Sequence, residues 1–199
     1  RHAQYKSDAG SRSLHKNAPL VAVWDDHEFA NDTWKRGAEN HSMDGSEGDF
    51  FARRSAAIKA YHEWMPIREQ ENNRIIFREF KVGKFIQLLM LDTRQFQRDQ
   101  QIQPQNYLTK SGFNQASFYN DLNATHRNLL GAEQLGWIKE KINSERLDWT
   151  ILGQQVLMTK VKFPDRTNML KEEDIAEFLK PYLKFLGLGS PSNLDAWDG

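Results

Sequence analysis

The chain has no cysteine among its 199 residues, so neither a disulfide nor a thiolate metal ligand can form within it. It also has no excess of charge, because 27 lysine and arginine residues balance 27 aspartate and glutamate residues. A nucleic-acid-binding domain would show a basic excess, and we therefore expect no specific nucleic-acid binding. No apolar run approaches the roughly 20 residues that a membrane-spanning helix needs, which predicts that the chain has no membrane span.

The sequence nevertheless has enough apolar material for a core. Hydrophobic residues make up 39% of the chain and aromatic residues 12%, with six tryptophans and twelve phenylalanines. A chain of this length forms one domain with a sizeable core, or a part of a larger domain. The mean hydropathy of −0.75 is low for a folded protein and indicates long polar surface loops. These numbers do not determine the oligomeric state.

Apolar, β-branched segments predict the strands of a sheet. We expect a buried strand at 20–24 and a hairpin of strands 75–80 and 84–91 around a tight turn at 81–83. The second hairpin strand is apolar almost throughout, as in a strand covered on both faces. A third buried strand is expected at 149–158, interrupted by Gly153-Gln154-Gln155.

Segments of helical periodicity alternate with these strands. A helix is predicted over 47–65, with Ser46 as its N-cap and Pro66 as its end. Three further helices are expected: a short one followed by a loop within 1–17, one over 133–146 with an apolar stripe of Leu135, Ile138 and Ile142, and one over 172–186. Strands alternating with helices predict an α/β domain with a mixed sheet.

Two polar stretches separate these elements. Residues 31–46 are dense in Asn, Asp, Gly and Ser and are predicted to form a loop. Residues 97–128 form a long excursion rich in Gln, Asn, Ser and Thr. Long segments without regular structure are uncommon in compact domains and tend to be functional.

Charge follows two of the apolar strands directly. The stretch "VAVWDDHEFANDTW", residues 21–34, runs from an apolar strand into Asp25-Asp26-His27-Glu28, and the strand at 84–91 runs into Asp92-Thr93-Arg94. Active sites of open α/β sheets gather outside the carboxyl ends of the strands. Carboxylates packed together out of water repel one another, and a hard cation with oxygen ligands removes that conflict. A neighbouring histidine can then bind metal or donate a proton to a reacting oxygen.

Structural explanations exist for the same residues. The Asp-Asp-His-Glu run also fits a solvated turn whose aspartate caps a helix. Arg94 fits a structural ion pair, and Gln154 and Gln155 fit ordinary polar positions of a strand. The acidic run 44–49 faintly suggests calcium, but it lacks the spacing of an EF-hand and is explained more simply by helix capping.

Three blocks of the sequence resemble one known family. "VAVWDDHEFANDTW" resembles the strand-end motif of the PhoD-like alkaline phosphatases and phosphodiesterases, which belong to the calcineurin-like metallophosphatases. "LMLDTRQFQRDQ" and "LGAEQLGWIKEKINSERLDWTILGQQVLM" resemble the next two blocks, and the opening "RHAQYKSDAG" and the closing "AWDG" are similar as well. The resemblance runs in the family's order over nearly the whole chain.

The resemblance implies a metallophosphatase-like layered sandwich in which mixed β-sheets are flanked by helices. A Gly-Asp block of the family is expected before residue 1, and a Gly-Asp-x-His block with further ligands is expected after residue 199. Residues 1–199 are thus expected to be the central part of one catalytic domain, incomplete at both ends. We expect the isolated chain to be inactive.

Roles for individual residues follow from the resemblance alone. Asp26 stands where metallophosphatases place the Asn of Gly-Asn-His-Asp/Glu, which implies a metal ligand, and Asp25 and Asn31 are further candidate ligands. His27 is implied to contact the substrate phosphate and to protonate the leaving oxygen, with Glu28 orienting its ring. Arg94 is implied to clamp the phosphate.

One departure from other metallophosphatases concerns the third strand. Gln154 or Gln155 falls near a position where those proteins carry a metal-binding histidine, so the ligand at that position stays open.

The implied activity is metal-dependent hydrolysis of phosphate monoesters or diesters, in which an activated water attacks phosphorus at alkaline pH. The resemblance implies a binuclear or trinuclear metal site, with iron and calcium as the expected metals and other divalent cations as alternatives. It also implies location in the periplasm, at the cell surface or outside the cell. The alternatives are a glycoside hydrolase that uses paired carboxylates and a non-catalytic remnant of the fold that binds metal or phosphate.

Overall fold

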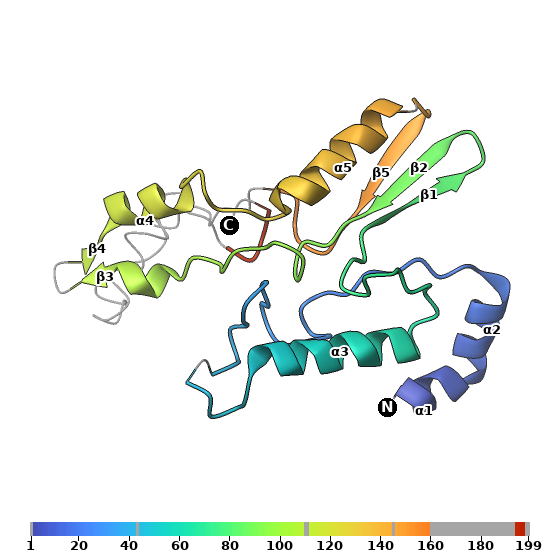
Figure 1. Ribbon diagram of the computed structural model, residues 1–199, viewed down its shortest axis with the longest axis horizontal. Coiled ribbons are helices and arrows are strands. Elements are labelled where there is room, and N and C mark those ends of the chain that lie inside the picture. Colours follow the sequence, from blue (N-terminus) through green and yellow to red (C-terminus); the bar gives the residue numbers. More distant parts are fainter. Residues whose placement is uncertain (1, 43, 110–111, 145, 160–193, 198–199) are drawn as a thin grey trace, which may run out of the picture. The chain divides into compact units, whose positions relative to one another are not determined.

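A computed structural model describes residues 2–42, 44–109, 112–144, 146–159 and 194–197. Contacts divide the chain into two compact units (Figure 1). Unit 1 comprises Arg1–Arg98 and Leu130–Gln155, and unit 2 comprises Asp99–Leu129 and Val156–Gly199. Within the described ranges, no helix is long and apolar enough to cross a membrane. The helix predicted over 172–186 lies outside the described residues.

The core of unit 1 is a mixed sheet of three strands in the order β1-β2-β5. Strands β1 (Arg78–Val82) and β2 (Ile86–Met90) form the predicted antiparallel hairpin. Its turn, 83–85, lies two residues later than expected, with Gly83 at a φ of 60°, a left-handed conformation that glycine adopts without strain. Strand β5 (Trp149–Gly153) pairs with β2 in parallel.

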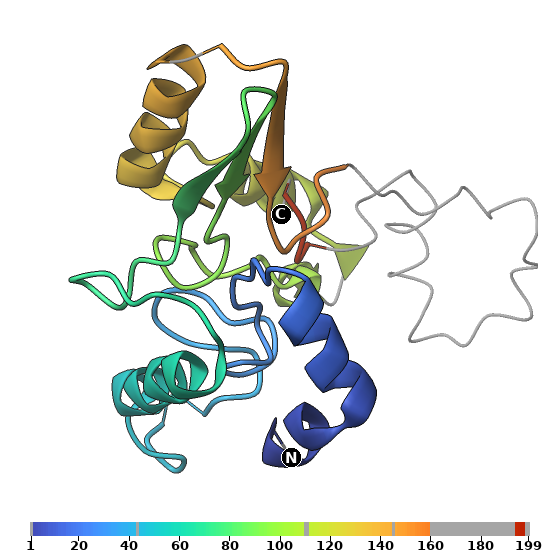
Figure 2. The ribbon, with the colours of Figure 1, turned by 90° about the vertical axis from the view of Figure 1, so that its right-hand side faces the viewer.

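Helix α5 (Gly131–Ser144) precedes β5 and runs along the sheet in two perpendicular views (Figures 1 and 2). It covers the face that carries Gln87, whose Nε2 donates to the Lys141 carbonyl oxygen at 3.1 Å. The stripe predicted for this helix is wrong in part. Ile138 is buried, but the side chain buried beside it is Gln134, whereas Leu135 and Ile142 are exposed.

The opposite face of the sheet is open among the described residues. Trp149 and Ile151 are 69% and 46% exposed, and they pair in register with Ile86 and Leu88 of β2. The predicted burial of β5 is therefore wrong among the described residues. Strand β2 has Gln87 and Leu89 buried on one face, and on the other face Ile86 and Leu88 are half-buried and Met90 is buried. The hairpin and the strand that begins at Trp149 were predicted correctly, because apolar β-branched runs favour the extended state. The predicted continuation of the third strand over 154–158 is wrong, since these residues form no strand.

Residues 20–24 do not form the predicted strand. Leu20 is exposed, and only Trp24 is fully buried. The backbone carbonyls of this extended segment are bound by side chains instead of by a neighbouring strand: Arg78 donates to the Ala22 oxygen and Gln155 donates to the Trp24 oxygen. Side-chain donors satisfy buried backbone groups as a strand would, so extension does not require a ladder.

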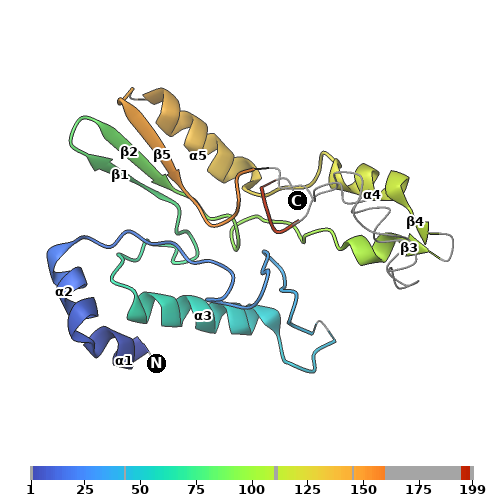
Figure 3. The same ribbon diagram turned by 180° about the vertical axis from the view of Figure 1, so that it is seen from behind.

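Helix α3 (Phe50–Trp64) lies beside the segment that follows residue 20 (Figure 3). The helix begins three residues later than predicted, since Asp49 and not Ser46 is its N-cap and accepts from the Ala52 N–H at 2.9 Å. It ends before Pro66 as expected. Its buried face forms the main apolar cluster of unit 1, which consists of Trp24, Phe29, Ile58, Tyr61 and Ile76.

The chain start contains two short helices where one helix and a loop were expected. Helix α1 spans His2–Ser7 and α2 spans Ala9–Asn17, with Asp8 capping the second by accepting from the Ser11 N–H. Neither helix has a buried residue.

Unit 2 contains most of the polar excursion predicted over 97–128. It holds regular structure: the 3₁₀ turn η1 (Pro104–Tyr107), the paired strands β3 (Leu108–Thr109) and β4 (Gly112–Phe113), and helix α4 (Gln115–Leu122). Ile102, Phe118 and Leu194 form a small buried cluster. The predicted functional role of this excursion is not tested by these elements, and neither is the assignment of 1–199 to one catalytic domain.

Candidate active site

The acidic loop 25–28 is held between two buried aromatic residues of unit 1. Trp24 precedes the loop and is 0% exposed, and Phe29 follows it and is 6% exposed. Their rings meet edge to face at 5.4 Å, and Trp24 makes a similar contact with Tyr61 of α3. Because both ends of the loop are fixed in the core, the four polar residues between them are presented at the surface in a defined conformation.

Asp26 organises the turn from inside. Its carbonyl oxygen accepts from the backbone N–H groups of Phe29 and Ala30, each at 2.8 Å. Its carboxylate Oδ2 accepts from the Asp32 N–H at 3.0 Å, and its side chain is 13% exposed. Asp32 stands at φ 47, a left-handed conformation that aspartate tolerates better than most residues. The carboxylate is thus fixed in place and partly desolvated, as a metal ligand must be.

His27 is exposed, with 77% of its side chain accessible. Its Nε2 lies 2.9 Å from Asn31 Oδ1 and 3.6 Å from Asp26 Oδ2. The hydrogen bond to Asn31 and the negative charge of Asp26 raise the pKa of His27 above its ordinary value. A cation bound at Asp26 would oppose this effect, because it would neutralise the carboxylate.

A carboxylate fixes the orientation of the Asn31 amide. Asn31 Nδ2 donates to Glu39 Oε2, and an ionised carboxylate can only accept. The Asn31 oxygen must therefore face His27, so His27 Nε2 carries a proton and donates it. Glu28, which was expected to orient His27, instead accepts from the Asp25 N–H at 2.7 Å. Sequence reasoning missed Glu39, since nothing local connects residues eight apart in a loop.

Arg94 brings the second strand end to this loop. Its Nε donates to Asp25 Oδ1 at 2.7 Å, with 4% of the Arg94 side chain and 46% of the Asp25 side chain exposed. The two residues are 69 positions apart, so the fold does unite the two charged strand ends that the sequence singled out. The contact fits a phosphate clamp anchored through Nε, and it equally fits the structural ion pair that was weighed against it.

Asp92 has a structural place that the sequence did not reveal. It is fully buried, its Oδ2 accepts from Trp24 Nε1 at 3.0 Å, and its Oδ1 accepts from the N–H groups of Arg94 and Gln95, each at 2.8 Å. Burial raises the pKa of Asp92, while these donors act in the opposite direction. Its position two residues before Arg94 was the available signal, since aspartate often accepts from the backbone two residues on.

The two glutamines of the third strand are now distinguishable. Gln155 reaches both strand ends, through Trp24 on one side and Thr93 on the other. Its side-chain amide bonds to backbone and hydroxyl groups of these segments.

The candidate ligands fit part of a metal site. Asp25, Asp26 and Asn31 offer carboxylate and amide oxygens, which suit hard cations such as calcium. Among the residues that the structure describes, no group of three or more His, Asp or Glu side chains is close enough to hold a metal ion. The described residues do not by themselves form a complete metal site.

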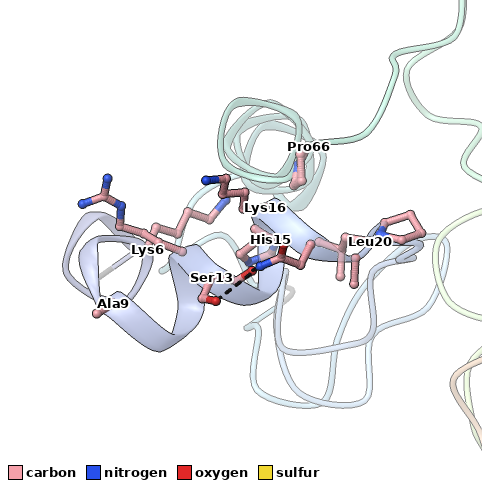
Figure 4. A pocket seen from close by; sticks show the side chains of 11 residues that line it. Lys6, Ala9, Ser13, His15, Lys16, Leu20 and Pro66 are labelled. Carbon is pink, nitrogen blue, oxygen red and sulfur yellow. Dashed lines mark hydrogen bonds between the residues drawn. The ribbon is translucent and has the colours of Figure 1, made fainter.

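A surface hollow of unit 1 lies elsewhere. It is lined by residues of α1, of α2 and of the segments around Leu20 and Pro66, including the basic side chains Lys6, His15 and Lys16 (Figure 4). None of the candidate site residues lines it. It is therefore not the site that the strand ends define.

A mixed sheet whose central strand β2 is followed by a guanidinium in contact with an acidic, imidazole-bearing loop is an arrangement found in α/β enzyme domains. A family model described as "PhoD-like phosphatase" matches residues 1–199, and the chain belongs to this family. It is 34% identical over 167 residues to alkaline phosphatase D of Bacillus subtilis (strain 168). A solved structure described as "Structure of PhoD" matches it with a TM-score of 0.68 and 30% identity, covering 100% of this chain.

These comparisons confirm the family resemblance and the mixed α/β fold. The matched region is 82% of this chain but 27% of the Bacillus relative, and the structural match spans 32% of the solved chain. The chain thus spans about a third of the length of these relatives or less.

Proposed function

We propose that the protein containing this chain hydrolyses phosphate monoesters or diesters in a metal-dependent reaction. One observation supports this most directly in a PhoD-like chain: the 2.7 Å contact of Arg94 with Asp25 joins a guanidinium from one strand end to the acidic loop of another. Because the contact brings the Arg94 guanidinium within hydrogen-bond distance of a candidate metal ligand, it supports a role for Arg94 in phosphate binding. Guanidinium is suited to this task, since its fork of N–H groups matches phosphate oxygens.

Each residue of the site then has a distinct role. Asp26, with Asp25 and Asn31 as further ligands, holds metal. Arg94 binds the non-bridging phosphate oxygens while its Nε stays anchored on Asp25. In its imidazolium form, His27 gives its Nε2 proton to the oxygen of the leaving alcohol and becomes a neutral imidazole protonated at Nδ1, while Asn31 and Glu39 orient the ring. Bound metals supply positive charge against the phosphate oxygens and make water a better nucleophile.

Iron with calcium is the proposed metal content, in a binuclear or trinuclear site, and other divalent cations are alternatives. We propose export of the parent protein to the periplasm, the cell surface or the medium. Both proposals rest on the family alone. Family membership gives no support to glycoside hydrolysis.

Removal of metal tests the proposed function. We expect the full-length protein to cleave bis(p-nitrophenyl) phosphate or p-nitrophenyl phosphate at alkaline pH, to lose that activity after chelation and to regain it with iron and calcium. Metal analysis of the purified protein is the accompanying measurement. Turnover that survives complete chelation, or absence of turnover in a metal-replete protein, would contradict the proposal. The second result would favour a non-catalytic remnant.

Glu39→Gln tests whether Asn31 acts as a metal ligand or as the hydrogen-bond acceptor that orients His27. A glutamine can donate as well as accept, so Asn31 is free to flip and His27 loses its fixed acceptor. We expect kcat in the full-length enzyme to fall about tenfold for alkyl phosphate esters, the lower range for partners that orient a functional side chain, and to change little for nitrophenyl esters.

Glu47→Gln is the matched control for that substitution. Glu47 also accepts a backbone N–H in this region, from Ser42 at 2.6 Å, but it has no contact with Asn31 or His27 among the described interactions. Loss of metal from the Glu39→Gln variant, with an equal deficit on both kinds of ester, would show that Asn31 acts as a metal ligand and not through His27.

A further inference from the structure

We propose that Gln155 is a positioning residue for the reaction. It fixes the position of the loop 25–28, which carries the candidate metal ligands, relative to Arg94, the candidate phosphate-binding residue. The inference rests on the proposed function and concerns a residue whose role the family resemblance left open. Gln155 stands two residues after the end of β5, where the third strand of the sheet approaches the other two strand ends.

Four hydrogen bonds use the full capacity of the Gln155 amide. Its Nε2 donates to the carbonyl oxygens of Trp24 at 2.8 Å and Leu91 at 2.9 Å. Its Oε1 accepts from the N–H and from the hydroxyl of Thr93. Backbone carbonyls only accept and backbone N–H groups only donate, so the amide has a single possible orientation.

The partners of this amide are the immediate neighbours of the site residues. Trp24 directly precedes Asp25 and Asp26, and Thr93 directly precedes Arg94. One side chain therefore connects the backbone of both segments whose side chains meet in the 2.7 Å contact between Asp25 Oδ1 and Arg94 Nε. A displacement of one segment relative to the other by more than about 0.5 Å would stretch a bond to Gln155 beyond the usual hydrogen-bond range.

Residues 20–24 are especially dependent on such a link. They do not pair with another strand among the described residues. The backbone hydrogen bonds of the sheet therefore do not fix the position of the acidic loop 25–28. The Trp24 indole bond to Asp92 fixes the side chain, at 3.0 Å, and the Gln155 bond fixes the backbone. We infer that these two bonds replace the missing ladder at the point where the loop begins.

Two substitutions of Gln155 test the proposal in the full-length enzyme. Gln155→Glu retains an acceptor but loses both N–H donors, and it turns a negative charge toward two carbonyl oxygens. Gln155→Met retains length and loses all four bonds. Partners that orient metal ligands and functional side chains typically contribute about 10- to 100-fold in activity or metal affinity. We expect kcat and metal affinity, the latter measured by metal titration, to fall within that range.

Gln87→Met is the matched control. Gln87 is a fully buried glutamine of the same sheet, and its amide bonds to Glu79 and Thr150 side chains and to the Lys141 carbonyl. It makes none of its described bonds to the segments that carry the site. We expect both Met variants to lower the melting temperature by similar amounts, while only Gln155→Met changes kcat and metal affinity at temperatures where both variants are folded.

Thr93→Val supplies a milder variant that is expected to fold even if the Gln155 variants do not. It removes only the hydroxyl bond to Gln155 and keeps the β-branched shape. A smaller deficit in the same two quantities supports the proposal. If kcat and metal affinity match those of the Gln87→Met control in every folded variant, Gln155 is only structural and the proposal is overturned. Inactivity of the metal-replete wild-type enzyme would instead overturn the proposed function itself.

Discussion

Asp26→Ala in the full-length enzyme should abolish most of the activity by removing metal. Asp26 is the candidate ligand whose position the turn fixes most firmly, because both its carbonyl and its carboxylate accept backbone N–H groups within the loop. Partners that merely orient ligands contribute about 10- to 100-fold, so loss of a ligand itself should exceed about 100-fold in kcat. Metal content and kcat should fall together, and added metal should restore only part of the activity.

Asp44→Ala controls for the change of charge. Asp44 is an exposed acid of the same polar segment, and its described bond is to the Ser46 N–H, outside the site. Its removal should leave kcat and metal content as they were. An Asp26→Ala enzyme that keeps its metals would show that Asp26 is a turn-forming residue. Two results together would favour the non-catalytic remnant: the wild-type protein shows no turnover, and Asp26→Asn leaves metal and phosphate binding unchanged.

His27→Ala should act on the leaving group and not on the metals. The His27 side chain is exposed and donates from Nε2 to Asn31, which leaves it close to the candidate ligands without being one of them. A positioned general acid typically contributes about 10²- to 10⁴-fold. That contribution matters most when the leaving alcohol is a strong base. We therefore expect a deficit of this size for alkyl phosphate esters, a small deficit for nitrophenyl esters, and unchanged metal content.

His126→Ala is a suitable control, since His126 is an exposed histidine of unit 2 and not part of the strand-end loop. It should leave the ratio of the two rates unchanged. If His27→Ala slows both esters equally, or if it lowers metal content, His27 is a ligand or a structural residue and proton donation must come from another group.

The positions of the charged strand ends were predictable from sequence because their signal is local. An apolar run followed directly by acidic residues is visible within a dozen positions, and so is the hairpin around Gly83. The same holds for α5, since helical periodicity extends over several turns of one segment. The exact helix starts were less predictable. Ser46 and Asp49 can both accept an N–H group as the N-cap of α3, and which of them does so depends on what the first turn packs against.

The residues that connect these segments were not predictable. Glu39 lies eight positions from Asn31, Asp92 lies 68 positions from Trp24, and Gln155 lies 131 positions from the same tryptophan. Nothing in the composition around a glutamine or a buried aspartate tells which distant carbonyl or indole it will meet. Burial was mispredicted for the same reason, since Trp149 has a strand-forming side chain whether or not another segment covers it.

The sequence by itself thus determined the family, the alternation of strands and helices, and the chemical groups that the site can use: acidic oxygens, one imidazole and one guanidinium. Only the tertiary structure decided that Arg94 contacts Asp25, that Asn31 rather than Glu28 contacts His27, and that Gln155 joins the two segments. The physical reason is that propensity and hydrophobic periodicity act over a few residues of one segment, whereas a hydrogen bond between segments depends on the packing of all the elements that bring its donor and acceptor within about 3 Å.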